Sequence, residues 1–245
     1  MAIEVAAPPA SKAVSEAAPA AALAESPPVD AIGVLGGTFD PIHFGHLRLA
    51  EEIADGCGLA QVRVIPSGIP PHRRAPRASA QQRFDMVCAA VTGNARLVAD
   101  QSEIFREQPC FTVDTLTGLR AEFGAQTPIC LMLGVDAFLA LPTWHCWQRL
   151  FELTHIVVAQ RPGYTLDQSL LPAPLVAEFE ARYIADARSI HDRAHGIIVK
   201  VAITALDISA TGVRAHIAAR RSARYLLPDI VLDYIQANTL YQGEP

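Results

Sequence analysis

The sequence predicts an α/β protein with a doubly wound, Rossmann-like parallel sheet and helices on both faces, behind a disordered N-terminal tail. From about residue 30, short apolar runs rich in β-branched residues alternate with amphipathic segments. Such runs are typical of parallel strands covered on both faces, and the alternation implies right-handed crossovers within one sheet. The expected strands cover residues 32–39, 62–66, 95–99, 129–134, 155–159 and 199–205.

The segments between the strands carry helix start and stop signals. Ser79 and Gln82 have the spacing of a capping box, which predicts a helix from there to Val91. Thr112 is expected to cap a helix that is stopped by Gly124. The last expected helix includes a proline suited to a first helical turn. Besides these, helices are expected at residues 175–184, 213–221 and 228–238.

Residues 1–29 differ from the rest of the chain, because they are rich in alanine and proline and include no aromatic residue. Such a composition cannot bury enough apolar surface to offset the entropy lost on ordering. With 51% hydrophobic residues, the whole chain can bury one substantial core. We therefore expect a flexible tail, residues 1–29, and one domain, residues 30–245.

Charge, cysteines and hydropathy limit the partners and the compartment. The net charge of −5 disfavours nonspecific nucleic-acid binding, which requires a basic surface. The five cysteines are odd in number and no pair has Cys-x-x-Cys spacing, which favours a reducing compartment over a disulfide framework or a zinc site. No apolar run reaches the roughly 20 residues of a membrane span, and the N-terminus lacks the features of a signal peptide. We therefore expect a cytoplasmic protein with neither a nucleic-acid nor a membrane partner.

The most informative stretch is GGTFDPIHFGH at residues 36–46. It joins an apolar run to an amphipathic one, so a strand ends at a glycine pair and a helix begins near two histidines. The glycines, Gly36 and Gly37, let the backbone approach a ligand closely, and a helix N-terminus presents N–H groups and partial positive charge to phosphate. His43 and His46 are three residues apart and share a helix face. The stretch therefore predicts two imidazoles and a set of amides directed at one phosphate chain.

A second cluster, DISATGVR at residues 207–214, follows the last expected strand and leads into a helix. Ser209 or Thr211 is suited to cap that helix, which is the common role of these residue types at such a position. The alternative is that the hydroxyls and helix amides hold a triphosphate, with Arg214 balancing its charge. Nucleotidyl transfer needs this kind of alignment and donor set around phosphorus. Beside the 36–46 stretch, the second interpretation is favoured.

Two further stretches lie after expected strands. PPHR at residues 70–73 follows the second strand, and an exposed basic turn is its simplest interpretation. Asp136 follows the fourth strand, where it either caps the next helix or binds ribose hydroxyls. Trp144 is either a core residue or an indole that stacks on an aromatic ring of a ligand. The sequence shows no recognisable Ser-His-Asp or Cys-His arrangement, so a mechanism with a covalent enzyme intermediate has no candidate nucleophile.

Taken together, these motifs resemble those of the bacterial nicotinate-nucleotide adenylyltransferases, which belong to the nucleotidyltransferase superfamily with a His-x-Gly-His core. The resemblance extends from about Ile32 to Tyr241. Besides the two phosphate-directed stretches, it includes FTVDTL at residues 111–116, RPG at 161–163, and the more specific PPHR at 70–73 and PTW at 142–144.

The resemblance implies adenylyl transfer from ATP to nicotinate mononucleotide, which yields deamido-NAD and pyrophosphate by in-line attack without a covalent enzyme intermediate. His43 and His46 would be the catalytic residues, and Mg²⁺ would be bound through the ATP phosphates rather than by a protein cage. The implied ATP site comprises Gly36, Gly37, Thr38, Phe39, His43, His46, Ile208, Ser209, Thr211 and Arg214. The implied mononucleotide site comprises Thr38, Ser67, His72, Arg73, Thr112, Asp136, Thr143 and Trp144.

Two positions depart from the family pattern. Phe111 stands where the family often has tyrosine, and Ser67 and Gly68 occupy a turn where relatives often place asparagines near the pyridine carboxylate. Three alternatives remain. The first is a phosphopantetheine adenylyltransferase, but that family is usually shorter and often has threonine in place of His43. The second is a non-catalytic nucleotide-binding regulator, which would be favoured by loss of a motif histidine. The third is a relative of the transfer-RNA-charging enzymes, which would need room for an anticodon domain. The sequence is compatible with a homo-oligomer.

Overall fold

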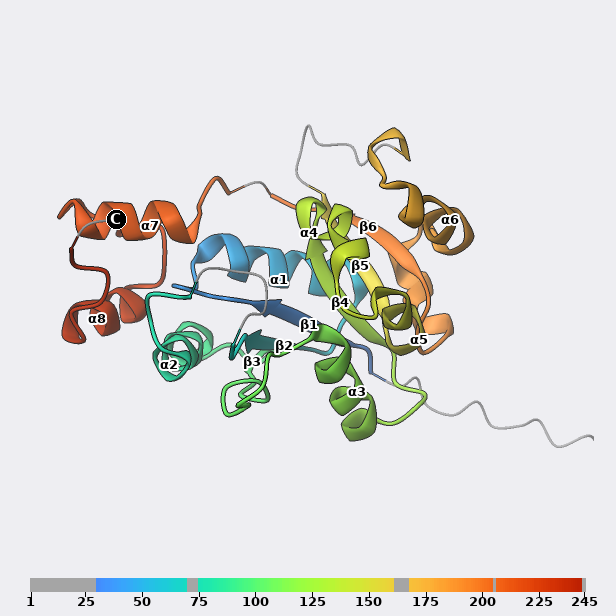
Figure 1. Ribbon diagram of the computed structural model, residues 1–245, viewed down its shortest axis with the longest axis horizontal. Helices are drawn as coiled ribbons and strands as arrows, with labels where there is room; N and C mark the ends of the chain where they lie inside the picture. The colour runs from blue at the N-terminus through green and yellow to red at the C-terminus, as the bar shows by residue number, and fades with distance from the viewer. Residues whose placement is uncertain (1–29, 70–74, 161–167, 205, 244–245) are drawn as a thin grey trace, which may run out of the picture.

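The computed structural model describes residues 30–69, 75–160, 168–204 and 206–243 (Figure 1). Its strands form one parallel sheet in the order β3-β2-β1-β4-β5-β6. The predicted doubly wound parallel sheet is therefore confirmed. The strands are β1 (Ile32–Gly37), β2 (Gln61–Pro66), β3 (Leu97–Ala99), β4 (Ile129–Gly134), β5 (His155–Gln160) and β6 (Ile198–Ala202).

Three strands are shorter than predicted, and β1 shows a physical reason. The last hydrogen bond between β1 and the β2 side of the sheet is the one that the Ser67 N–H donates to the Gly37 carbonyl, at 2.8 Å. Two residues later Phe39 has φ +49°, in the left-handed region, so the chain has already turned out of the sheet. An apolar residue there continues the sequence pattern but belongs to the turn. β3 begins two residues after the start of the predicted 95–99, and β6 ends three residues before the end of the predicted 199–205.

Helices cover both faces of the sheet, and successive strand residues point to opposite cores. Leu35 of β1 lies in one core with residues of α1, α2, α7 and α8, whereas its neighbour Val34 lies in the other with residues of α3, α4, α5 and α6. These helices are α1 (Phe44–Cys57), α2 (Ala80–Val91), α3 (Thr112–Phe123), α4 (Val135–Leu139), α5 (Leu150–Leu153), α6 (Ala173–Arg182), α7 (Ala210–Ala218) and α8 (Asp229–Ala237). Short 3-10 helices are η1 (Leu141–Thr143), η2 (Trp147–Arg149), η3 (Gln168–Leu170) and η4 (Ala187–Asp192).

The predicted helix boundaries are partly confirmed. The capping box at α2 is present, since Gln82 N donates to Ser79 Oγ at 3.2 Å and Ser79 N donates to Gln82 Oε1 at 2.9 Å. The prediction that Thr112 caps α3 is wrong: the N-cap is Phe111, with no side-chain cap, and Thr112 is the first helical residue. Helix α7 begins at Ala210, three residues before the predicted start.

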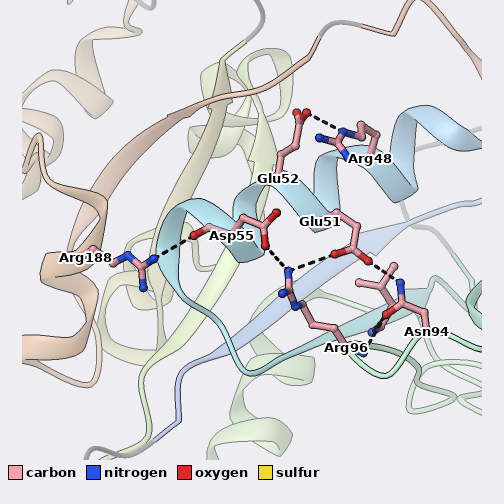
Figure 2. A network of polar contacts seen from close by, with 8 residues as sticks. Arg48, Glu51, Glu52, Asp55, Asn94, Arg96 and Arg188 are labelled. Atoms are coloured by element: carbon pink, nitrogen blue, oxygen red, sulfur yellow. Dashed lines mark hydrogen bonds and ion pairs between the residues drawn. The ribbon is translucent and has the colours of Figure 1, made fainter.

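A polar network fixes the outer side of α1 (Figure 2). Arg96, just before β3, donates through Nη1 to Glu51 at 3.2 Å and to Asp55 at 2.6 Å. Glu52 accepts from Arg48 at 2.7 Å and from the hydroxyl of Thr204, in the segment after β6, at 2.6 Å. Each such surface contact contributes little to stability alone. Together they link the helix that follows β1 to the segments around β3 and β6.

All five cysteines are free thiols. None of the helices in the described ranges is long and apolar enough to cross a membrane. The predicted N-terminal tail, residues 1–29, and the stretches 70–73 and 161–163 lie outside the described residues.

Candidate active site

A cavity of about 380 Å³ opens at the carboxyl ends of β1 and β4. These neighbouring strands are where the strand order reverses, which is the usual ligand crevice of a doubly wound sheet. Its size lies within the range of small-molecule sites. The predicted site residues that line it are Gly36, Gly37, Thr38, His46, Ser67, Thr112 and Trp144.

The two motif histidines lie together, but only His46 lines the cavity, at one end; His43 is buried and outside the lining. His43 is the N-cap of α1 and His46 is in its first turn, with their rings stacked at 3.7 Å between centroids. The backbone N–H of His43 donates to Nδ1 of His46 at 3.3 Å. Because Nδ1 is the acceptor, a neutral His46 carries its proton on Nε2. Nε2 of His46 is therefore a hydrogen-bond donor.

The charge state of His46 follows from its surroundings. Burial, followed by the neighbouring His43, holds the pKa of His46 well below its ordinary value of 6.5. The imidazole is therefore neutral at pH 7. Phe39, also predicted as a site residue, is buried beneath it with its ring edge-on at 5.0 Å between centroids, so it supports His46 and does not line the cavity.

The second predicted phosphate cluster lies beside the first. A Cβ on Gly45 would stand 3.4 Å from the Ile208 carbonyl oxygen, so the start of α7 lies in contact distance of α1. The same Cβ would stand 3.0 Å from the His43 ring, which is a tight contact. Arg214 donates to the Asp40 carbonyl at 2.7 Å and to the Thr211 hydroxyl at 3.2 Å. The fold thus brings together the two clusters, which are far apart in the sequence.

Ser209 is the N-cap of α7, and its Oγ accepts from the Gly212 N–H at 3.1 Å. The capping interpretation of Ser209 is therefore confirmed, and a contact with phosphate stays a prediction. Ser209 and Thr211 are exposed, whereas Arg214 is partly buried.

Asp40 is the structural centre of the turn after β1. Its carboxylate accepts from the backbone N–H groups of Arg77 and Ala78, at 2.9 and 3.1 Å, and from the Tyr241 hydroxyl at 2.8 Å. Burial, and then the negative charge of Asp40, raise the pKa of Tyr241. The carboxylate is therefore occupied with holding the turn, the start of α2 and the end of the chain in place.

The opposite end of the cavity is aromatic and lies at the N-terminus of α3. Phe111 packs against His145 at 4.5 Å between ring centroids, and Trp144 lies in the same lining. Thr112 begins α3, whose first turn presents positive potential to a ligand. The Ser67 hydroxyl nearby is inaccessible to solvent and has no hydrogen-bond partner within the described residues.

Four predicted mononucleotide-site residues lie outside the cavity lining or cannot be placed. Asp136 is exposed in the first turn of α4 and does not line the cavity. The Thr143 hydroxyl donates to the Ala140 carbonyl at 2.7 Å and is likewise outside the lining. His72 and Arg73 lie outside the described residues.

The chain was compared with known proteins. The cytidylyltransferase-like family model matches residues 34–216. A relative from Dechloromonas aromatica, named a probable nicotinate-nucleotide adenylyltransferase, is 50% identical over 212 residues, which are 86% of this chain and 98% of the relative. The chain belongs to the nicotinate-nucleotide adenylyltransferase family. A relative of the same name from Halorhodospira halophila is 47% identical over 83% of this chain and 92% of its own length.

Solved structures agree with the fold of this adenylyltransferase family member. The Plasmodium falciparum nicotinic acid mononucleotide adenylyltransferase complexed with NaAD superimposes with a TM-score of 0.64 at 15% identity, over 86% of this chain and 97% of that chain. The same enzyme complexed with APC gives a TM-score of 0.62 at 16% identity, over 86% and 97%. At these identities the likeness shows the shared Rossmann-like fold of nucleotidyltransferases.

The adenylyltransferase cavity also contains residues that were not singled out from the sequence as site residues. Phe111 and Thr115 belong to the FTVDTL stretch, and His145 follows Trp144, so position near a recognised motif was an available signal. Glu103 had no such signal, because a single carboxylate in a polar stretch normally faces water. Here burial raises the pKa of the Glu103 carboxyl, and the Thr115 hydroxyl donates to it at 2.6 Å.

A larger groove, of about 680 Å³, lies at the C-terminal ends of α7 and α8. Its lining includes Arg220, Arg221 and Arg224 and none of the predicted site residues. The smaller cavity is the candidate active site of this adenylyltransferase family member, because His46 and Trp144 both line it at the strand-order switch. The predicted residues Ile208, Ser209, Thr211 and Arg214 lie beside α1 but are not in its lining.

Proposed function

We propose that the protein transfers the adenylyl group of ATP to nicotinate mononucleotide, yielding deamido-NAD and pyrophosphate for NAD biosynthesis. The observation that carries the proposal is a single cavity with two chemically different ends. His46 and the start of α1 form one end, and an aromatic wall at the N-terminus of α3 forms the other. A dinucleotide product has the matching sequence of groups, with phosphates in the middle and a pyridine carboxylate at one end.

At the phosphate end, neutral His46 supplies an Nε2–H donor with no proton to lose near pH 7. Negative charge develops on the phosphate oxygens as the phosphorus is attacked and pyrophosphate leaves. A fixed donor directed at that charge lowers the barrier without reorganising. His43, stacked on His46, and Arg214, at the neighbouring start of α7, would complete the set of donors around the triphosphate.

At the pyridine end, the arrangement suits a flat anion. The indole of Trp144 offers a face for stacking, and the first turn of α3 at Thr112 offers backbone N–H groups to a carboxylate. Ser67 lines this end and its buried hydroxyl has no partner in the described residues, so a rotation of its side chain would bring the hydroxyl to a ligand oxygen. These contacts favour a mononucleotide with a carboxylate over one with a neutral amide.

We propose direct in-line attack of the mononucleotide phosphate on the α-phosphorus, with no covalent enzyme intermediate. One bond forms between a mononucleotide phosphate oxygen and the α-phosphorus, while the bond to the bridging oxygen of pyrophosphate breaks. Mg²⁺, when bound on the triphosphate, supplies neutralising charge. It would be held by phosphate oxygens and water, because the nearby Asp40 carboxylate is already occupied by three donors.

Pyrophosphate release measured with ATP, Mg²⁺ and each of three acceptors tests the proposal. Nicotinate mononucleotide should support turnover with a higher kcat/KM than nicotinamide mononucleotide, and phosphopantetheine should support none. Release with phosphopantetheine alone, or with no acceptor at all, would contradict the proposed function.

A further inference from the structure

Arg83 of α2 is a fully buried cation beneath the candidate active site. Its side chain is among the largest that are fully buried, with an exposed fraction of 1%. The guanidinium donates to the carbonyl of Thr38 at 2.8 Å, to that of Gly68 at 3.0 Å and to that of Ala78 at 3.4 Å. Ala78 directly precedes the N-cap of α2, whereas Thr38 and Gly68 belong to two other segments, so Arg83 joins the start of α2 to both of them.

This arginine has no carboxylate within ion-pair distance among the described residues. Burial lowers the pKa of Arg83, while the charges of Asp40, Tyr241 and Glu103 act in the opposite direction. Burying a charge without a close counterion is costly. Its direct hydrogen-bond acceptors are carbonyls, while the acidic groups act from a greater distance. This arrangement indicates a geometric role, because a planar fork of donors can hold several carbonyls in fixed directions.

Two of the three acceptors lie just after the ends of the neighbouring strands β1 and β2, in or beside the cavity lining. Thr38 belongs to the loop that carries the phosphate-directed motif, and Gly68 follows Ser67 in the turn after β2. Gly68 is also packed against Glu103 so closely that a Cβ would stand 2.1 Å from the Glu103 carbonyl oxygen. The turn has no room to shift in that direction. Arg83 therefore links the phosphate loop to a turn that is already held from the other side.

We propose that Arg83 is a positioning residue that fixes the ATP-phosphate loop at Thr38 relative to the mononucleotide turn at Ser67. This role rests on the proposed function and deepens it. In this proposal the ATP phosphates contact mainly the first segment and the pyridine end of the mononucleotide contacts the second, so each substrate is expected to bind alone with near-normal affinity when the link is lost. The reaction needs both in register, and a displacement of about 1 Å can cost on the order of 10²-fold in rate.

Arg120 provides a matched control. Arg120 is partly buried, and burial lowers its pKa as it lowers that of Arg83. It too donates to carbonyls from several segments, those of Thr127, Leu153 and Ala194. These carbonyls precede β4, β5 and β6, so Arg120 lies at the amino edge of the sheet, opposite the cavity. A substitution there tests the structural cost of losing such a cluster without touching the site.

The experiment compares Arg83→Lys, Arg83→Gln and Arg120→Lys with the wild-type protein. Melting curves, the Kd of each substrate alone by calorimetry, and kcat from pyrophosphate release are measured at a temperature where every variant is folded. We expect both Arg83 variants to lose about 10- to 100-fold in kcat with Kd changes under about threefold. We expect Arg120→Lys to lower the melting temperature and leave kcat within about twofold.

Normal kcat in the folded Arg83 variants, or equal losses in Kd and kcat, overturns the positioning role. If neither Arg83 variant folds, Ser79→Ala decides, because it removes the exposed cap of the helix turn that carries Arg83. A kcat loss of about threefold or more with unchanged Kd supports the role, and a normal kcat overturns it. A wild-type protein without turnover would instead contradict the proposed function, so the two failures are distinguishable.

Discussion

His46→Ala is the sharpest test of the phosphate end of the cavity. The substitution removes a ring that stacks on His43 at 3.7 Å and meets Phe39 edge-on at 5.0 Å. It also removes the acceptor of the His43 backbone N–H. In the proposed mechanism its main effect is loss of the Nε2–H donor of a residue that lines the cavity.

The magnitude follows from the role of that donor. A single preorganised donor to transition-state charge is typically worth about 10²–10³ in kcat, or roughly 3–4 kcal/mol. The lost packing of a partly buried ring and one backbone hydrogen bond should cost about 1–2 kcal/mol of unfolding free energy. We therefore expect kcat to fall at least 100-fold while the protein stays folded. His46→Gln, whose amide offers an N–H donor, should recover part of the loss.

Steady-state pyrophosphate release and a thermal melt on the same samples separate the two effects. His216→Ala is the control, because His216 faces the Ser222 carbonyl at the far end of α7. Because the pKa of His46 lies well below 6.5, its neutral donor form persists as the pH falls from 8 to 6.5. The kcat should therefore show no loss through this group over that interval. A His46→Ala protein with a lowered melting temperature and a normal kcat would refute the donor role.

Three further outcomes are expected. Trp144→Ala should raise KM for the mononucleotide much more than KM for ATP, since stacking on an aromatic platform is worth roughly 1–3 kcal/mol; equal rises for both substrates would remove Trp144 from the pyridine end. Deleting residues 1–29 should leave melting temperature and kcat unchanged, because their composition offers no apolar run able to dock, and a large loss of either would contradict this. His155, buried between the Arg193 carbonyl and the Ile197 N–H, has its pKa lowered by burial to about 4. As the pH falls, His155 is therefore protonated in the unfolded chain before it is protonated in the folded protein, and the unfolding free energy should fall by up to about 3 kcal/mol between pH 6.5 and pH 4. Chemical denaturation at several pH values should show that the unfolding free energy of His155→Gln depends less on pH than that of the wild-type protein.

The sheet could be predicted because its strands are buried on both faces and read as uninterrupted apolar runs. The ends of the strands could not, since Phe39 is as apolar as the strand before it and only its left-handed backbone takes it out of the sheet. The start of α3 was misplaced for a related reason. Threonine is a good capping residue in general, but here Phe111 takes the N-cap position while its ring packs on His145, a contact from a distant segment.

The two ends of the cavity differ in how much of them the sequence reveals, and the difference has a physical origin. The phosphate end is built largely by one strand–turn–helix unit, so its glycines and histidines are adjacent in the sequence and form a recognisable motif. The pyridine end is assembled from four segments, at Ser67, Glu103, Phe111 and Trp144, that meet only at the carboxyl edge of the folded sheet. Glu103 and Arg83 look like solvent-facing charges until the fold buries them. Adenylyl transfer is therefore the part of the proposed function that the motif supports most directly, whereas the proposed preference for an acid over an amide rests on contacts between segments that only the fold brings together.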